Sequence, residues 1–135
     1  MATNPLTDVV CGLIEKEGRF FWARKKPGKS QEGFWEMPGG KVQPGESYFA
    51  ALQRELEEEF GMQVRAGEET KIFLDHGNYR LWLVPVIWVH GPEFLVDHDA
   101  CGWFRAEEWS RLPMYGHERV LGEMGLRLRS ATDWE

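Results

Sequence analysis

One segment of the sequence, residues 47–61, combines an apolar stripe with a crowded acidic face, and this pattern limits how the chain can fold. Its apolar residues recur three or four positions apart, which predicts an α-helix from Ser47 to Phe60. Gly61 can adopt the left-handed backbone that ends many helices. The stripe consists of Phe49, Leu52, Leu56 and Phe60. We therefore expect a helix that buries one side against a sheet.

The same segment also carries a crowded acidic face, written RELEEE over residues 54–59. Helical spacing places Glu55, Glu58 and Glu59 on one face and turns Glu57 away from them. Like charges at this spacing repel by about 0.2–0.5 kcal/mol per pair. A bound cation would compensate, and ligands that are all oxygen suit Mg²⁺ or Mn²⁺ better than zinc or copper. A solvated acidic surface is the alternative.

The segment before this helix is rich in glycine. The pair Gly39-Gly40 permits close backbone approaches, which could aim a carbonyl oxygen at the same cation or bring amides near a phosphate. The turn Pro44-Gly45 then leads back to the helix. These features predict a cation or phosphate site between the glycine pair and the acidic face.

The rest of the chain alternates strand patterns with one more helix. Strands are expected at residues 8–14, 19–24, 63–65, 71–74, 79–89 and 102–104, and a helix at 116–128. Residues 25–33 are rich in glycine, proline and charge and predict a loop. With 42% hydrophobic residues and seven tryptophans, residues 1–135 are expected to form a single α/β layered domain.

Composition excludes several classes of protein. The net charge of -6 argues against nonspecific binding to extended nucleic acid, which normally needs a broad basic face. Cys11 and Cys101 form no CxxC pair, so we expect two buried thiols and neither a zinc site nor a disulfide framework. The N-terminal sequence MATNPLTD has no secretory pattern, and no apolar run approaches membrane-spanning length. A cytoplasmic location is expected.

The spacing Gly40, five residues, Glu46, seven residues, then RELEEEFGM resembles the signature of the Nudix hydrolases at every specified position, over residues 40–62. The opening hairpin, WEMPGGKV and LPMYGHERVL are similar to the MutT-like branch. This resemblance implies an α/β/α sandwich with a mixed sheet. It also implies hydrolysis of a nucleoside diphosphate linked to another moiety, with Mg²⁺ or Mn²⁺ as cofactor.

The resemblance also implies roles for individual residues. Glu55, Glu58 and Glu59 would bind metal or orient the attacking water, with the Gly39 carbonyl as a further ligand. Arg54 and Glu46 would pair with each other or orient these glutamates. MutT-like relatives often carry another acid just before the tryptophan of a late strand. Here Gly102 precedes Trp103, with Asp97 and Asp99 slightly upstream, and this departure favours Glu55 as the general base.

Substrate contacts are expected in three places. Arg24 and Lys25 belong to a basic cluster where MutT-like enzymes bind phosphate, with Lys25 preferred, although a solvated loop is the alternative. Gly40 would bring its backbone close to the phosphates. His117 lies where such proteins use a polar side chain to read the base, although a lone histidine is more often structural. The aromatic residues Phe34, Trp35 and Tyr79 could stack on a base or pack in the core.

These observations favour a pyrophosphohydrolase that converts nucleoside triphosphates, including oxidised purines such as 8-oxo-dGTP, to a monophosphate and pyrophosphate. Dinucleoside polyphosphates, nucleotide sugars or RNA 5′ ends are alternative substrates. A noncatalytic nucleotide-sensing module is the alternative outside enzymes, and the intact glutamate set argues against it.

Overall fold

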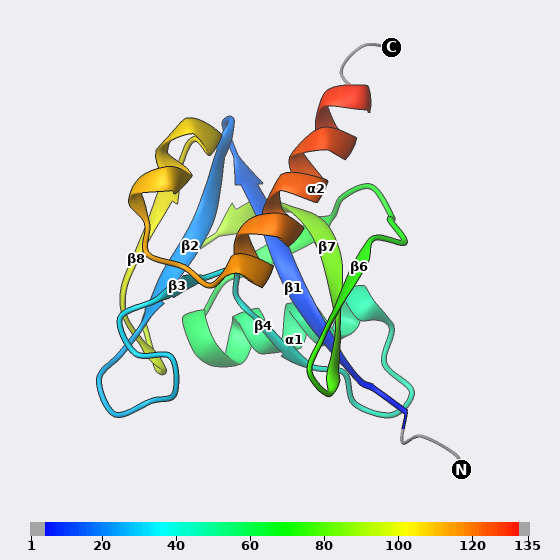
Figure 1. The fold of residues 1–135 in the computed structure, drawn as a ribbon, viewed down its shortest axis with the longest axis horizontal. Coiled ribbons are helices and arrows are strands. Elements are labelled where there is room, and N and C mark those ends of the chain that lie inside the picture. The colour runs from blue at the N-terminus through cyan, green and yellow to red at the C-terminus, as the bar shows by residue number, and fades with distance from the viewer. Residues whose placement is uncertain (1–4, 133–135) are drawn as a thin grey trace.

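A computed structural model describes residues 5–132, with side chains to residue 128. The elements, in chain order, are β1 (Thr7–Lys16), β2 (Arg19–Lys25), β3 (Trp35–Glu36), β4 (Gly39–Lys41), α1 (Tyr48–Phe60), β5 (Gln63–Ala66), β6 (Phe73–His76), β7 (Tyr79–His90), β8 (His98–Phe104), the 3-10 helix η1 (Ala106–Arg111) and α2 (Gly116–Thr132). Figure 1 shows one sheet with α1 behind it and α2 in front.

The sheet is mixed and is organised around β1. Strand β1 pairs in parallel with β7, in register from Thr7 with Tyr79 to Glu15 with Ile87. It pairs antiparallel with β2 at one end and with β4 at the other. Strand β8 extends the sheet beyond β2, while β5 and β6 both pair with β7. Parallel pairing of this kind requires helices on both faces, because its strands are buried on both sides.

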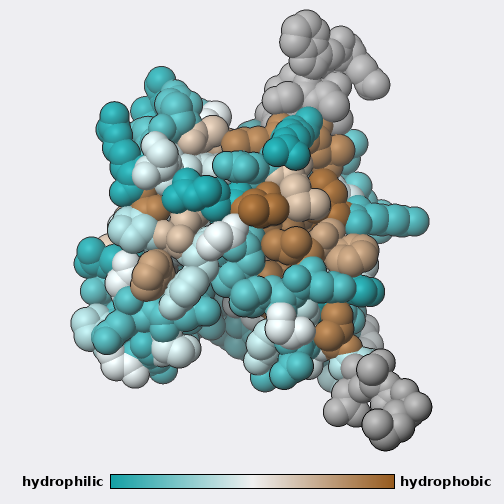
Figure 2. Space-filling model, viewed as in Figure 1, coloured by the Kyte–Doolittle hydropathy of each residue, from teal (hydrophilic) through white to brown (hydrophobic). Residues whose placement is uncertain are grey.

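Two apolar cores confirm the α/β/α arrangement. On β1, Val10 and Ile14 face the core under α1, whereas Cys11 and Leu13 face the core under α2. This alternation follows from the two-residue period of a strand. The α1 core takes up Leu52, Leu56 and Phe60 from the helix, and the α2 core takes up Leu121 with Trp109 of η1. In the space-filling view of the α2 side, apolar surface gathers beside α2 and polar side chains cover most of the remainder (Figure 2).

The predicted helix and opening hairpin are confirmed. The Ser47 hydroxyl accepts a hydrogen bond from the Ala50 amide at 3.1 Å, and α1 ends at Gly61, whose φ is 59°. Of the two cysteines, Cys11 is buried as expected, but Cys101 is only half-buried; both are free thiols. The short strands β3 and β4 and the helix η1 were not predicted, and α2 continues four residues beyond the expected end. No helix among residues 5–132 is long and apolar enough to cross a membrane.

Two features of the structure favour glycine at position 61. Its positive φ is unfavourable for any residue with a Cβ, and a Cβ there would lie 2.7 Å from the Phe94 ring. Gly45 has a positive φ of 81° but open space around it. We expect Gly45→Ala to lower the free energy of unfolding by roughly 1 kcal/mol and Gly61→Ala by roughly 2–3 kcal/mol. Urea unfolding monitored by tryptophan fluorescence measures both, and equal losses would contradict the packing argument.

Candidate active site

Arg54 occupies the centre of the acidic face. Its guanidinium binds Glu46 through two hydrogen bonds, Nε to Oε2 at 2.8 Å and Nη2 to Oε1 at 3.0 Å. Nη1 donates to Glu55 at 3.0 Å and approaches Glu58 at 3.5 Å. Nη2 also donates to the carbonyl of Lys41 on β4 at 3.1 Å. The predicted pairing of Arg54 with Glu46 is therefore present, and Arg54 links α1 to β4.

The remaining acids lie at different depths. Glu57 is exposed and Glu58 keeps 60% of its side chain exposed, whereas Glu55 and Glu59 are half-buried. Burial raises the pKa of Glu59 to about 7, aided by the nearby carboxylates of Glu55 and Asp97 and opposed by Lys25. Asp97 therefore lies close enough to influence the cluster from the chain segment before β8. The crowding predicted for this face is partly relieved by Arg54 and remains strong at Glu59.

Close packing, and not an unusual backbone angle, explains why glycine occupies positions 39 and 40. Neither Gly39 nor Gly40 has a positive φ. A Cβ on Gly39 would lie 1.8 Å from the carbonyl oxygen of Val10, and a Cβ on Gly40 would lie 2.4–2.8 Å from the carboxyl atoms of Glu55. Only glycine allows β4 to pair with β1 while the Glu55 carboxylate rests against its backbone.

A cavity of about 380 Å³ opens on the other side of β4. This volume suits a nucleoside or another molecule of similar size. Its lining includes Val9, Cys11, Lys25, Gln31, Glu36, Met37, Gly39, Gly40, Lys41, His76, Tyr79, Leu81, His117 and Glu118. The cavity therefore combines an apolar wall with ionisable groups, and it shares the glycine pair with the acidic face. We call it the β4 cavity.

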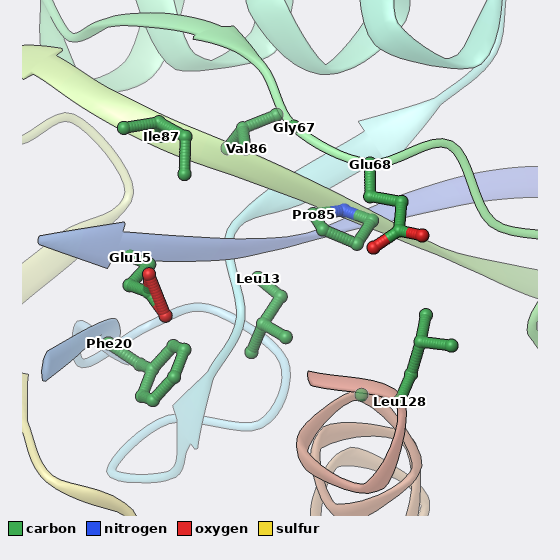
Figure 3. Close-up of a pocket in the computed structure, with 10 residues that line it drawn as sticks. Leu13, Glu15, Phe20, Gly67, Glu68, Pro85, Val86, Ile87 and Leu128 are labelled. Atoms are coloured by element: carbon green, nitrogen blue, oxygen red, sulfur yellow. The ribbon is translucent and has the colours of Figure 1, made fainter. Parts of the chain in front are cut away.

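Two other cavities lie away from the acidic face. One, of about 190 Å³, lies beside the C-terminal half of α2, where Leu13, Phe20 and Leu128 approach it from β1, β2 and α2 (Figure 3). The other, of about 620 Å³, lies between the start of α1 and the segment joining β5 to β6, against Trp82. Neither is lined by any of the acids around Arg54. The largest of the three cavities is therefore not the one that adjoins the acidic face.

His117 lies at the rim of the β4 cavity within a series of stacked rings. Its ring is 4.1 Å from that of His76 and 5.8 Å from that of Tyr115, which in turn lies 4.4 Å from Phe34. Burial lowers the pKa of His117, as does His76, and Glu36 opposes the shift. The stack joins the β2–β3 loop, the segment before α2, the start of α2 and the end of β6. His117 is therefore held beside the cavity by rings from other parts of the chain.

The predicted basic cluster separates into two groups. Lys25 lines the β4 cavity, with Nζ 3.4 Å from Oε2 of Glu36. Arg24, the residue before Lys25 on the strand, instead binds Asp99 at 2.7 Å. Lys29, in the loop that follows, binds Asp97 at 3.2 Å. Neighbouring residues of a strand point to opposite faces, so Arg24 does not join Lys25 in the lining.

The three aromatic residues that were expected to contact a base or pack in the core lie in different surroundings. Tyr79 lines the β4 cavity with 40% of its surface exposed. Phe34 contributes to the ring stack, whereas Trp35 packs edge-on against Phe104 at 5.4 Å. Of the three aromatics, only Tyr79 is part of the cavity lining.

Three ionisable residues near the cavity were not singled out from the sequence. Glu36 follows Trp35 on β3, His98 is buried at the start of β8, and Glu118 is buried in the first turn of α2. Oε2 of Glu118 accepts a hydrogen bond from the Met37 amide at 3.1 Å. One signal was available for Glu118: it lies three residues before Leu121, on the side of the predicted helix that must be buried.

Comparison with known proteins agrees with this geometry. The NUDIX domain family matches residues 4–121, and the chain belongs to the Nudix family. It is 34% identical over 131 residues to the CTP pyrophosphohydrolase of Escherichia coli K12, covering 93% of this chain and 96% of that protein. The chain is therefore a member of a family of hydrolases, similar along nearly its whole length to a pyrophosphohydrolase.

Solved structures extend the comparison. The solution structure of the E. coli ORF135 protein superposes with a TM-score of 0.74 at 30% identity, covering 94% of this chain and 93% of that one. The MutT protein from Methanosarcina mazei Go1 superposes with a TM-score of 0.75 at 22% identity, covering 96% and 99%. The second likeness shows the shared fold alone.

Glu118 makes stability depend on pH. Burial raises its pKa to about 8, and the neighbouring Glu36 adds to the rise. Between the unfolded pKa near 4.5 and the folded value, the folded chain holds the extra proton, so stability present below pH 4.5 is lost as pH rises through about 8. We expect Glu118→Gln, which cannot ionise, to match the wild type at pH 5 and exceed it at pH 9. The difference should be about 2–4 kcal/mol, on a scale of ~1.4 kcal/mol per pKa unit.

Urea unfolding at pH 5, 7 and 9 measures this effect. Glu123→Gln is the matched control, because Glu123 is exposed on the same helix and its variant should follow the wild-type profile. Parallel profiles for Glu118→Gln and the wild type would show that Glu118 is already charged in the folded protein at neutral pH.

Proposed function

We propose that this chain is a Mg²⁺-dependent pyrophosphohydrolase that converts nucleoside triphosphates to nucleoside monophosphates and pyrophosphate. One observation carries the proposal: the β4 cavity and the acidic face of α1 meet at Gly39-Gly40, where the Glu55 carboxylate lies against the backbone. A nucleoside in the cavity would have its phosphates directed across β4 toward the acids. The similarity to a CTP pyrophosphohydrolase supports the same substrate class.

The donor set fits a hard divalent cation. Glu55, Glu58, Glu59 and the Gly39 carbonyl offer oxygen ligands alone, which suit Mg²⁺ or Mn²⁺. Burial raises the pKa of Glu59 to about 7, and the nearby carboxylates of Glu55 and Asp97 add to the rise, so a cation here would offset repulsion between these acids. Among the described residues no three His, Cys, Asp or Glu side chains converge tightly enough to hold an ion as they stand. Arg54 holds Glu55 and Glu58, so metal binding would draw these carboxylates together.

Individual residues of the chain have different roles in the proposed reaction. When bound, the cation neutralises phosphate charge and lowers the pKa of a coordinated water. Glu55, fixed by Arg54 and by contact with Gly40, accepts a proton as water attacks phosphorus and the pyrophosphate oxygen leaves. Arg54 and Glu46 hold Glu55 in position. Lys25 and the Gly40 backbone bind phosphate oxygens, and His117 contacts the base at the rim.

A turnover assay over a panel of substrates tests the proposed function. The panel comprises the common nucleoside triphosphates, 8-oxo-dGTP, a dinucleoside tetraphosphate, a nucleotide sugar and an RNA with a 5′ triphosphate. Mg²⁺-dependent release of pyrophosphate and monophosphate, abolished by EDTA, is the expected result. Binding of nucleotides without turnover of any of them would favour a sensing module.

The acidic face supplies a matched set of variants. Glu58→Gln and Glu59→Gln each remove one anionic ligand with little change in volume, and we expect kcat to fall roughly 10²-fold or more. Glu57→Gln removes the same charge from the exposed side of the helix and should change kcat by less than about 3-fold. Steady-state kinetics at saturating Mg²⁺, with circular dichroism as the folding control, measure all three. Equal losses at Glu57 and Glu58 would refute the assigned face.

Lys25 and Arg24 provide a second matched pair. Lys25→Ala should lower kcat/KM for all triphosphates by about 10–100-fold, because it removes a charged hydrogen bond to phosphate. Arg24→Ala loses an exposed ion pair with Asp99 and should leave kcat/KM within about 3-fold. If Arg24→Ala causes the larger loss, the phosphate contact belongs to Arg24 instead.

A further inference from the structure

Three neighbouring strands bring a histidine, a carboxylate and a lysine together beside the β4 cavity. On one edge of β2, Ala23 pairs with Glu36 of β3. On the other edge, Lys25 pairs with His98 of β8. Oε2 of Glu36 lies 2.9 Å from Nε2 of His98 and 3.4 Å from Nζ of Lys25. One carboxylate oxygen is therefore shared between the His98 ring and the ammonium group that we assign to phosphate binding.

The His98 ring is fixed by burial and by stacking. Only 1% of its side chain is exposed, and its ring is stacked on that of Phe60, with the ring centres 5.1 Å apart. Nδ1 is buried and has no hydrogen-bond partner among the described residues. A proton on Nδ1 would therefore have no acceptor, which favours the tautomer with its proton on Nε2. In that tautomer His98 donates a hydrogen bond to Glu36.

Lys25 is held by Glu36 more loosely than His98 is. Its separation of 3.4 Å from Oε2 exceeds the about 2.7–2.9 Å that is typical of a charged N–H donor and a carboxylate. Within the part of the chain that the structure describes, this is the one ion pair that Lys25 makes. An ammonium group has three donors, so a loose ion pair leaves Lys25 able to bind another anion. Lys25 also lines the β4 cavity, where a phosphate could reach it.

We propose that His98 is a positioning residue for phosphate binding: its hydrogen bond to Oε2 of Glu36 keeps Lys25 loosely paired and available to the phosphates of the nucleotide. Without this donor, Glu36 would form a closer ion pair with Lys25, and a phosphate would have to displace it. His98 acts through Glu36 and Lys25, because it is buried and is not among the residues that line the cavity. The inference rests on the proposed function for its ligand, a nucleoside polyphosphate.

Two variants of His98 separate the donor from the ring. His98→Phe removes the donor and keeps a ring against Phe60, whereas His98→Gln keeps an amide N–H near the position of Nε2 and removes the ring. The ligand is α,β-methylene-CTP with Mg²⁺, because its methylene bridge resists hydrolysis, and calorimetric titration measures its Kd. The Kd should rise about 3–10-fold for His98→Phe and stay within about twofold of the wild type for His98→Gln. Equal losses, or a larger loss for His98→Gln, would mean that the ring and not the donor matters, and would overturn the inference.

A double-mutant cycle tests whether His98 acts through Lys25. Lys25→Ala removes the ammonium group, so adding His98→Phe to it should cause no further change in the Kd of α,β-methylene-CTP. His90→Phe is the matched control, because His90 is exposed and pairs with Glu93, and it should leave the Kd unchanged in both backgrounds. Additive losses for Lys25→Ala and His98→Phe, or an unchanged Kd in a folded His98→Phe protein, would refute the role of His98.

Steady-state kinetics with CTP give a second measure. The KM should rise about 3–10-fold for His98→Phe while kcat stays within about 3-fold, because the acids of α1 are unchanged. A fall in kcat at unchanged KM would overturn the inference. If His98→Phe does not fold, His98→Asn replaces it, because its amide nitrogen lies near the position of Nδ1 and cannot reach Glu36. Coupling between His98 and Lys25 in a protein that binds the analogue but hydrolyses no nucleotide would uphold the inference while the proposed function fails. A wild type that does not bind the analogue would overturn both.

Discussion

The site depends on one guanidinium that holds three separate parts of the chain together. Arg54 binds Glu46 before the helix, Glu55 within it and the Lys41 carbonyl on β4. Because a planar guanidinium has five donors in a fixed arrangement, these contacts set the position of α1 relative to β4 as well as the direction of Glu55. Glu46, Glu55 and Glu58 are thus oriented by a positive charge that they themselves partly neutralise.

Under the proposed function, this arrangement separates phosphate chemistry from recognition of the base. The acids lie on α1, whereas the residues that line the β4 cavity come mainly from β1, β2, β3, β6, β7 and α2. The cavity and the acidic face share the β4 residues Gly39, Gly40 and Lys41, and Lys25 lies in the cavity while also lowering the pKa of Glu59. The acidic face and the β4 cavity therefore meet at the backbone of β4 and at the Lys25 side chain.

The sequence was most informative where local physics alone decides the structure. Ser47 and Gly61 marked the ends of α1, and helical spacing separated Glu57 from the other acids, because these features depend on residues within one helix. The strands β3 and β4 were missed because each has only two or three residues and exists through pairing with β2 and β1.

The site was less predictable where distant segments meet. The contact between Glu36 and His98 joins residues 62 positions apart, and the hydrogen bond from Met37 to Glu118 spans 81. No local pattern can reveal such pairs. Arg24 and Lys25 were grouped by composition, yet the alternation of the strand separates them, and Asp99 on β8 determines where Arg24 points.

The absence of side chains at Gly39 and Gly40 has a consequence for how the protein can change over time. A heavier residue at Gly39 would collide with the Val10 backbone, and one at Gly40 would displace the Glu55 carboxylate, so neither position can change without altering the junction between the cavity and the acidic face. Under the proposed function, new substrate preferences would arise from cavity residues on β3, β6, β7 and α2, which lie apart from the acids of α1. A descendant of this chain could thus acquire a different nucleotide while inheriting its hydrolytic centre intact.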